Sequence, residues 1–154
     1  MTTVTTGKKA PNFNAKDENG NVRTLAEFEG NKLVLYFYPK DDTPGCTAEA
    51  CDLKDNYQKF IAAGYAILGV SPDNEAKHQK FIAKYELPFS LLADVDNAVA
   101  LAYGVWVEKS MYGRKYMGIA RTTFIIDEKG NIEQIIEKVD TKNHTEQILH
   151  QRDF

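Results

Sequence analysis

The chain has 154 residues, a formal net charge of −3 at pH 7 and an ordinary charged fraction of 27%. This length suits one domain, expected to span residues 1–154, that can bury roughly two thirds of its unfolded surface without disulfide staples. The weak negative charge gives no long-range attraction for nucleic acid or for an anionic membrane. No run approaches the roughly 20 apolar residues that span a bilayer, and the amino terminus has no apolar signal core. We therefore expect a soluble, cytoplasmic protein that binds neither nucleic acid nor membrane.

The amino-terminal part of the chain predicts small elements followed by a central strand. The turn signal Gly20-Asn21 lies in a predicted hairpin over residues 12–22, and residues 24–28 predict a short helical turn. Residues 32–38 form a dense apolar and aromatic run that ends before a proline, which suits a buried strand better than a helix. We expect this strand to lie in the middle of a sheet.

A helix is predicted directly after this strand. Thr43 can cap its start, and Pro44 suits a first helical turn. Apolar residues then recur at helical spacing until Gly64 ends the helix. Residues 65–70 predict a second buried strand.

The remaining sequence alternates between helical and extended patterns. In order, we expect a helix ending before Pro88, a short segment over 89–92, a helix over 95–103, a hairpin of strands 122–126 and 132–139, and a helix over 142–150. This order of elements predicts a three-layer α/β sandwich around a central mixed sheet. No linker, repeat or low-complexity segment divides the sequence.

The only two cysteines are Cys46, at the predicted start of the first long helix, and Cys51, five residues further on. Unpaired backbone N–H groups and the helix dipole favour a thiolate at a helix N-terminus, so Cys46 is suited to nucleophilic chemistry. A small buried hydrophobe is the alternative role. Helical residues five apart lie about 8 to 9 Å from each other, too far for a disulfide without backbone movement. Pairing of these cysteines would therefore require the first turns of the helix to unwind.

A nearby cysteine pair in a reducing compartment is more often catalytic, redox-sensing or metal-binding than structural. The three histidines, His78, His144 and His150, show no ligand spacing with either cysteine, so we expect no metal site. Motifs for dinucleotide binding, phosphate binding and serine hydrolysis do not occur.

The segment YFYPKDDTPGCTAEAC, from Tyr36 to Cys51, resembles the peroxiredoxin family. The family signature P-x-x-x-[ST]-x-x-C stands here as Pro39, Thr43 and Cys46. The segment is most similar to the bacterioferritin-comigratory, or peroxiredoxin Q, branch, in which a resolving cysteine follows the peroxidatic one by five positions. The motifs APNF, GVSPD, LPFSLLAD and KYMGIARTTFIID extend the resemblance over nearly the whole chain.

This resemblance implies a thioredoxin-like fold and a thiol peroxidase that reduces hydrogen peroxide and organic hydroperoxides without metal, haem or flavin. It implies that Cys46 becomes a sulfenic acid, which Cys51 resolves as an intramolecular disulfide. Thioredoxin or a similar dithiol would then reduce that disulfide, and the branch suggests a monomer. The alternative for Cys51 is a buried helix-face residue, with an external thiol resolving the sulfenic acid.

Four further residues take roles from the resemblance, and each has a simpler alternative. Thr43 would bond the thiolate and peroxide, or only cap the helix. Pro39 would shield the sulfur from water, or only end a strand. Arg121 would stabilise the thiolate and transition state, or be a solvated strand-end charge. Glu49 would orient the arginine, or only interact with the helix dipole.

Two other functions stay open at this stage. A thioredoxin-like disulfide reductase carries C-x-x-C where this chain has T-P-G-C, so Thr43 in place of the first cysteine argues against it. A peroxide-sensing redox switch would use the same cysteine oxidation to change a surface. Residues 106–118 mix cations with tyrosines, as single-stranded nucleic-acid sites do, but we expect a loop packed beside the active site.

Overall fold

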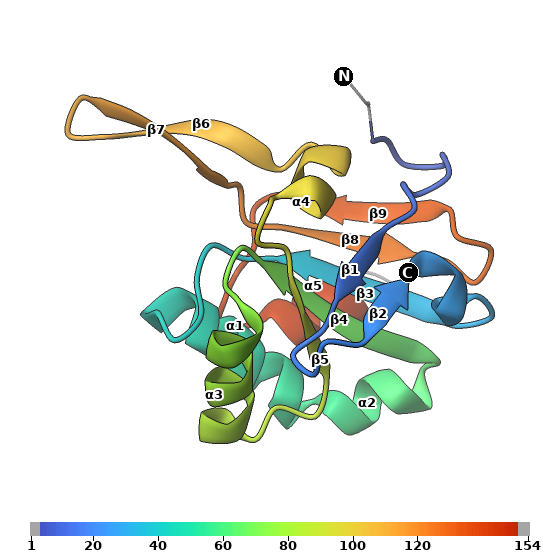
Figure 1. Cartoon of the computed structure of the whole chain (residues 1–154). Helices are drawn as coiled ribbons and strands as arrows, with labels where there is room; N and C mark the ends of the chain where they lie inside the picture. The colour runs from blue at the N-terminus through green and yellow to red at the C-terminus, as the bar shows by residue number, and fades with distance from the viewer. Residues whose placement is uncertain (1–3, 151–154) are drawn as a thin grey trace.

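The computed structural model describes residues 4–150, except for the side chain of His150, so the two ends of the predicted domain lie outside the description. A five-stranded mixed sheet with the order β5-β4-β3-β8-β9 forms its centre (Figure 1). The strands are β3 (Lys32–Phe37), β4 (Tyr65–Ser71), β5 (Ser90–Ala93), β8 (Thr122–Ile126) and β9 (Ile132–Ile136). The middle strand β3 pairs parallel with β4 and antiparallel with β8. Both of its faces are covered, which explains its continuous apolar run.

Helices and short elements cover the two faces of this sheet. One face carries α1 (Pro44–Asp55), α2 (Tyr57–Ala62), α3 (Glu75–Tyr85) and α5 (His144–His150), and the other carries α4 (Ala98–Ala102) and the 3-10 helix η1 (Leu25–Phe28). Two separate clusters of buried apolar side chains fill the spaces between the sheet and these layers. The predicted three-layer sandwich is therefore confirmed.

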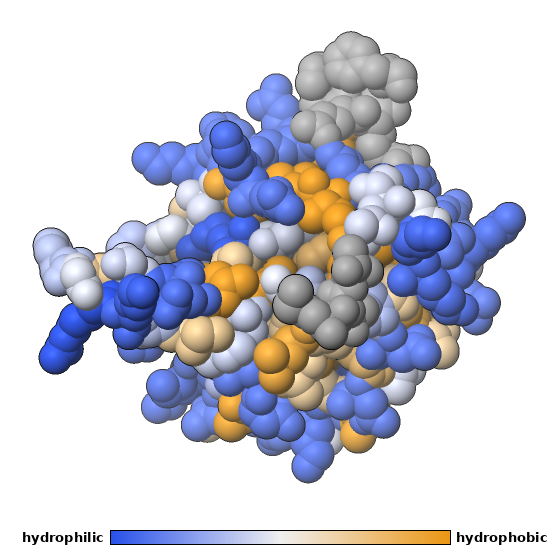
Figure 2. All heavy atoms as spheres, turned by 90° about the horizontal axis from the view of Figure 1, so that it is seen from above, coloured by the Kyte–Doolittle hydropathy of each residue, from blue (hydrophilic) through white to orange (hydrophobic). Residues whose placement is uncertain are grey.

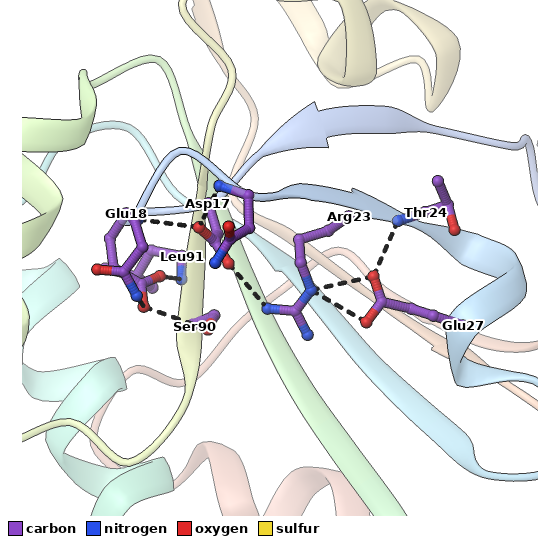
Figure 3. Close-up of polar contacts among 9 residues, drawn as sticks. Asp17, Glu18, Arg23, Thr24, Glu27, Ser90 and Leu91 are labelled. Carbon is purple, nitrogen blue, oxygen red and sulfur yellow. Dashed lines mark hydrogen bonds and ion pairs between the residues drawn. The ribbon is translucent and has the colours of Figure 1, made fainter.

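The predicted amino-terminal hairpin forms from β1 (Asn14–Lys16) and β2 (Val22–Thr24) and lies next to β5. Figure 3 shows how polar contacts fix it. Arg23 Nη1 donates to Asp17 Oδ2 at 3.2 Å within the hairpin, and the backbone N–H of Leu91 in β5 donates to Glu18 Oε1 at 3.2 Å. These contacts attach the hairpin to the edge of the central sheet.

The expected loop over residues 106–118 is instead a two-stranded arm of β6 (Trp106–Met111) and β7 (Arg114–Ile119). The strands reverse through Tyr112 and Gly113, whose φ angles of 52° and 80° suit a two-residue hairpin turn. The arm projects from the body of the molecule, and its surface is largely hydrophilic (Figures 1 and 2). The loop prediction was wrong because cations and tyrosines conceal the strand pattern.

Two predicted helices have other limits in the structure. The helix that the sequence extends to Gly64 is broken at Asn56, whose side-chain Nδ2 donates to the Asp52 carbonyl at 2.8 Å and so competes with the helical ladder. The helix predicted over 95–103 begins only at Ala98, because Asn97 has a left-handed φ of 63°. Within residues 4–150, no helix has the length and apolar character needed to cross a membrane.

Candidate active site

Cys46 lies in the first turn of α1, shortly after the end of the central strand β3. The first i to i−4 bond into this helix joins Thr47 N–H to the Thr43 carbonyl at 2.8 Å. The backbone N–H of Cys46 therefore precedes the helical ladder and is one of the unpaired donors of the helix N-terminus. The Cys46 side chain is only 1% exposed, and both cysteines are free thiols.

Arg121 contacts the Cys46 sulfur directly. Its Nη2 donates to Sγ at 3.2 Å, while its Nη1 donates to Glu49 Oε1 at 2.7 Å. Arg121 immediately precedes β8, and the pairing of Thr122 with Phe37 brings the start of β8 to the end of β3. The sheet register thus carries the guanidinium to the helix that follows β3. One guanidinium consequently connects the thiol to a buried carboxylate.

Gly45, in the same helix turn, lies close to the Arg121 guanidinium. A Cβ atom at Gly45 would lie only 3.3 Å from Arg121 Nη2, closer than ordinary van der Waals contact. Glycine therefore gives the arginine room beside the sulfur.

The charges of this site affect one another through low-dielectric surroundings. Burial raises the pKa of Glu49 to about 7, although the guanidinium of Arg121 opposes this shift. Burial alone would lower the pKa of Arg121, but the negative charges of Cys46 and Glu49 outweigh it and raise that pKa. The arginine stays positive, so it stabilises negative charge on the sulfur.

The remaining predicted site residues are Thr43, Pro39 and Cys51, and they make fewer contacts with the Cys46 thiol. Thr43 occupies the N-cap position with extended backbone, but its hydroxyl donates to the Lys40 carbonyl at 3.0 Å and makes no capping bond among the described residues. Pro39 is partly buried, two positions after the end of β3. Cys51 is partly exposed inside α1, and burial raises the pKa of its thiol. Among the described residues, neither Thr43 nor Pro39 makes a hydrogen bond to Cys46, so their predicted roles stay predictions.

An open cleft of about 820 Å³ lies beside Arg121. Val107 from the arm, Phe124 from the sheet and Val139 from the segment after β9 line it together with Lys109. Burial, together with the charge of Arg121, lowers the pKa of Lys109. Arg121, the residue that contacts the sulfur, is thus part of the wall of an open cleft.

Two histidines near this segment were not found by the sequence reasoning. His144, in α5, places Nε2 3.5 Å from Glu49 Oε2 and 2.8 Å from Thr123 Oγ1. His78, in α3, places Nδ1 2.6 Å from Asp41 Oδ2. Only the fold brings these distant positions together, and no sequence spacing indicates it. Within residues 4–150, no group of three or more histidine, cysteine and acidic side chains could hold a metal ion.

Fold and site together define a thiol-based redox enzyme, because a helix N-terminus and an arginine both favour an ionised sulfur. The chain belongs to the AhpC/TSA family, whose model matches residues 6–135. Peroxiredoxin Bcp of Bacillus subtilis is 45% identical over 147 residues, covering 96% of this chain and 94% of its own. Peroxiredoxin Bcp of Escherichia coli K12 is 41% identical over 150 residues, with 97% and 96% covered.

Solved structures agree with this assignment. Peroxiredoxin Q of Xanthomonas campestris matches with a TM-score of 0.86 at 39% identity, covering 92% of this chain and 89% of its own. The chain is therefore a thiol-dependent peroxidase with a thioredoxin-like fold, as its resemblance to the bacterioferritin-comigratory branch predicts.

Proposed function

We propose that Cys46 is the peroxidatic cysteine and that Cys51 resolves it. The Cys46 thiolate attacks one oxygen of the hydroperoxide, the O–O bond breaks, and the leaving oxygen departs as water or an alcohol after protonation. Cys46 is then a sulfenic acid, which condenses with the Cys51 thiol to a disulfide and water. Thioredoxin or a similar dithiol restores both thiols. The observation that carries this proposal is the 3.2 Å bond from Arg121 to Cys46 Sγ at a helix N-terminus.

Arg121 has two functions in this reaction. It favours the thiolate of Cys46 in the resting enzyme, and it stabilises the charge that develops on the oxygens in the transition state. Glu49 fixes the guanidinium plane by accepting from Nη1 at 2.7 Å. Thr43 orients the peroxide and Pro39 limits the access of water. These roles rest on the family motif together with positions at the start of α1.

The resolving step requires a change in α1, because this helix is continuous over both cysteines. Asp52, next to Cys51, is anchored to α5, where it accepts from the backbone N–H of Thr145 at 2.6 Å. The unwinding therefore starts in the turns at the N-terminus of the helix, before this anchor. Amide hydrogen exchange of the reduced and oxidised forms tests this step, and loss of protection across residues 47–53 on oxidation is expected. Unchanged protection there would contradict it.

The substrates, partners and location follow from the same proposal. A trapped-complex study of the Xanthomonas campestris bacterioferritin comigratory protein names alkyl peroxide reduction as its activity. The partly apolar cleft beside Arg121 supports organic hydroperoxides, in addition to hydrogen peroxide, for this chain. We further propose that the protein acts as a cytoplasmic monomer with a single domain.

A peroxide-consumption assay with a thioredoxin recycling system tests the assigned cysteine roles. Cys46→Ser should lose all activity, whereas Cys51→Ser should still complete one turnover and stop. An insulin-reduction assay run beside it distinguishes the disulfide-reductase alternative, which predicts faster turnover of insulin than of peroxide. Retained peroxide turnover in Cys46→Ser would overturn the assignment.

A further inference from the structure

Asp42 lies where the chain turns from β3 into α1, and its backbone conformation is unusual. Its φ of 59° falls in the left-handed region that few residues other than glycine adopt. The helix that carries Cys46 begins two residues later, at Pro44. The conformation of Asp42 thus sets the direction in which the chain enters this helix, and contacts with the surrounding structure have to maintain it.

The contacts that hold Asp42 come from the C-terminal end of α3. Lys84 Nζ donates to Asp42 Oδ2 at 2.8 Å, and the Tyr85 hydroxyl donates to Asp42 Oδ1 at 2.7 Å. These two hydrogen bonds lower the pKa of Asp42, so its carboxylate is charged at neutral pH. The Lys84 ammonium also lies 5.3 Å from the centre of the Tyr85 ring. Both carboxylate oxygens of Asp42 are therefore bonded to one turn of a neighbouring helix.

The preceding residue, Asp41, is held differently. Its carboxylate is buried and lies 2.6 Å from the ring of His78, which is 0% exposed. The side chain of Asp42 is instead 43% exposed, and that of Lys84 is 58% exposed. Water can replace exposed hydrogen bonds at little cost, whereas buried polar groups lose their partners at a high cost. When the turn before α1 opens, Asp41 therefore stays in place and the chain rotates at Asp42.

Few side chains connect this segment to distant parts of the chain. Among the described residues, the side chains of residues 42–48 form hydrogen bonds to partners more than ten positions away only at Asp42 and Cys46. Oxidation changes the contact at Cys46, because the sulfur of a sulfenic acid carries a hydroxyl group in place of the negative charge. The bonds of Asp42 are then the polar side-chain contacts that keep the turn closed.

We propose that Lys84 is a positioning residue for the resolving step of the peroxidase reaction, because its ion pair with Asp42 keeps the turn before α1 closed. Release of this pair lets the turn open, so that Cys51 reaches the sulfenic acid of Cys46. The S–S bond then forms, the S–O bond of Cys46 breaks, and the hydroxyl group leaves with the Cys51 proton as water. The inference rests on the proposed roles of both cysteines. It implies that the strength of a surface ion pair sets the delay before resolution.

The first test measures the rate of disulfide formation after one equivalent of hydrogen peroxide, by quenched flow and mass spectrometry. Lys84→Met removes the ion pair but leaves the Tyr85 bond to Asp42. We expect disulfide formation to become about threefold faster, the factor that a typical exposed ion pair contributes to an equilibrium constant. Lys80→Met is the matched control, since it removes another exposed lysine of α3 that forms no ion pair with the described residues. Equal rates in the two variants would overturn the inference.

A double-mutant cycle and a salt series test whether Lys84 acts through Asp42. Asp42→Asn keeps a residue type that tolerates left-handed backbone and an oxygen that accepts from Tyr85, but it loses the charge. It should accelerate disulfide formation as much as Lys84→Met does, and combining the two should add nothing. Raising the salt concentration from about 0.05 M to about 1 M should accelerate the unsubstituted chain but not Lys84→Met, because salt screens exposed pairs. Additive effects, or equal salt responses, would overturn the inference.

Amide hydrogen exchange of the reduced protein separates this inference from the proposed peroxidase roles, because it needs no peroxide. The amides of residues 47–50 should exchange about threefold faster in Lys84→Met than in Lys80→Met. Equal exchange in the two variants would overturn the inference even where the disulfide forms normally. Absence of a disulfide between Cys46 and Cys51 in the unsubstituted chain would instead overturn the proposed cysteine roles, and the role of Lys84 in resolution with them.

Discussion

Two buried pairs of a histidine and a carboxylate flank the segment that carries Cys46, and they are built differently. Asp41 and His78 tie the residues before α1 to α3. Glu49 and His144 lie between α1 and α5, on the side of Arg121. Both histidines are 0% exposed, so burial does not distinguish the pairs. The difference lies in how completely each polar atom is bonded.

The first pair has a partner for every side-chain polar atom. His78 Nδ1 lies 2.6 Å from Asp41 Oδ2, and its Nε2 lies 2.9 Å from the Leu92 carbonyl. The other Asp41 oxygen accepts from the Tyr38 hydroxyl at 2.5 Å. Both ring nitrogens thus face acceptors, which suits a ring that carries a hydrogen on each. A fully bonded network of this kind fixes the geometry of the loop that it holds.

The second pair keeps one oxygen without a hydrogen bond and a contact of 3.5 Å. Such a network costs stability, and burial raises the pKa of its carboxyl group, Glu49, to about 7. The comparison therefore assigns a static role to Asp41 and His78, whereas Glu49, beside His144, changes its charge near neutral pH.

Breaking each pair at its histidine should have the largest effect and should separate the two roles. His78→Leu leaves the Asp41 carboxylate buried without a cation, so it should lower the free energy of unfolding by about 3 to 5 kcal/mol. His144→Leu should cost about 1 to 2 kcal/mol, because Glu49 keeps Arg121. Urea denaturation at pH 7 measures both. Equal losses would remove the distinction between the pairs.

The pH dependence of stability gives a second test, through Glu49. Its pKa rises from 4.5 to about 7 on folding, so between these values the folded chain binds more protons than the unfolded one. Stability from this group therefore falls as pH increases from 4.5 to 7, by about 3 kcal/mol in all. The free energy of unfolding of Glu49→Gln should not show this decrease. The amount by which it exceeds that of the unsubstituted chain should therefore grow with pH.

The control for this prediction is Thr145→Ala, which should keep the slope of the unsubstituted chain while lowering its overall stability. Denaturant unfolding at several pH values between 4.5 and 8 provides the comparison. A constant difference between Glu49→Gln and the unsubstituted chain across that range would show that Glu49 does not titrate there.

The smallest expected effects on stability come from removing the hydroxyl groups of two stacked tyrosines, which form a closely matched pair of variants. The rings of Tyr36 and Tyr38 lie 5.4 Å apart, and each residue is 1% exposed. The Tyr38 hydroxyl donates to Asp41, whereas the Tyr36 hydroxyl has no partner among the described residues. Tyr38→Phe should cost about 1 to 2 kcal/mol and Tyr36→Phe about 0.5 kcal/mol or less. Similar thermal midpoints for the two variants would show that the bond to Asp41 contributes nothing.

The sequence predicts much of the fold because its signals are local. The buried run over Lys32–Phe37 and the cap and proline before Cys46 have short-range causes, so β3 and the start of α1 were confirmed. The arm at Trp106–Ile119 was missed because both of its faces are partly or fully exposed along most of its length. Without a buried face, period-two alternation disappears from the sequence.

The site was predicted unevenly for a similar reason. The family motif led to Arg121, 75 positions from Cys46, whereas residue spacing alone gives no sign of that contact. His144 and His78 were discounted because they show no ligand spacing, and their partners depend on how α5 and α3 pack on the sheet. Thr43 occupies the expected cap position, but its hydroxyl donates to the Lys40 carbonyl within the local turn and makes no capping bond among the described residues.

The order of the strands has a consequence for synthesis of the chain. Cys46 leaves the ribosome well before Arg121, and β3 has its partner β4 long before β8 is complete. At roughly 5 to 20 residues per second, the 75 residues that separate them take several seconds to translate. During that interval the nascent cysteine lacks the guanidinium of Arg121. The reactive thiol is therefore acquired late, only when the second half of the sheet has been added.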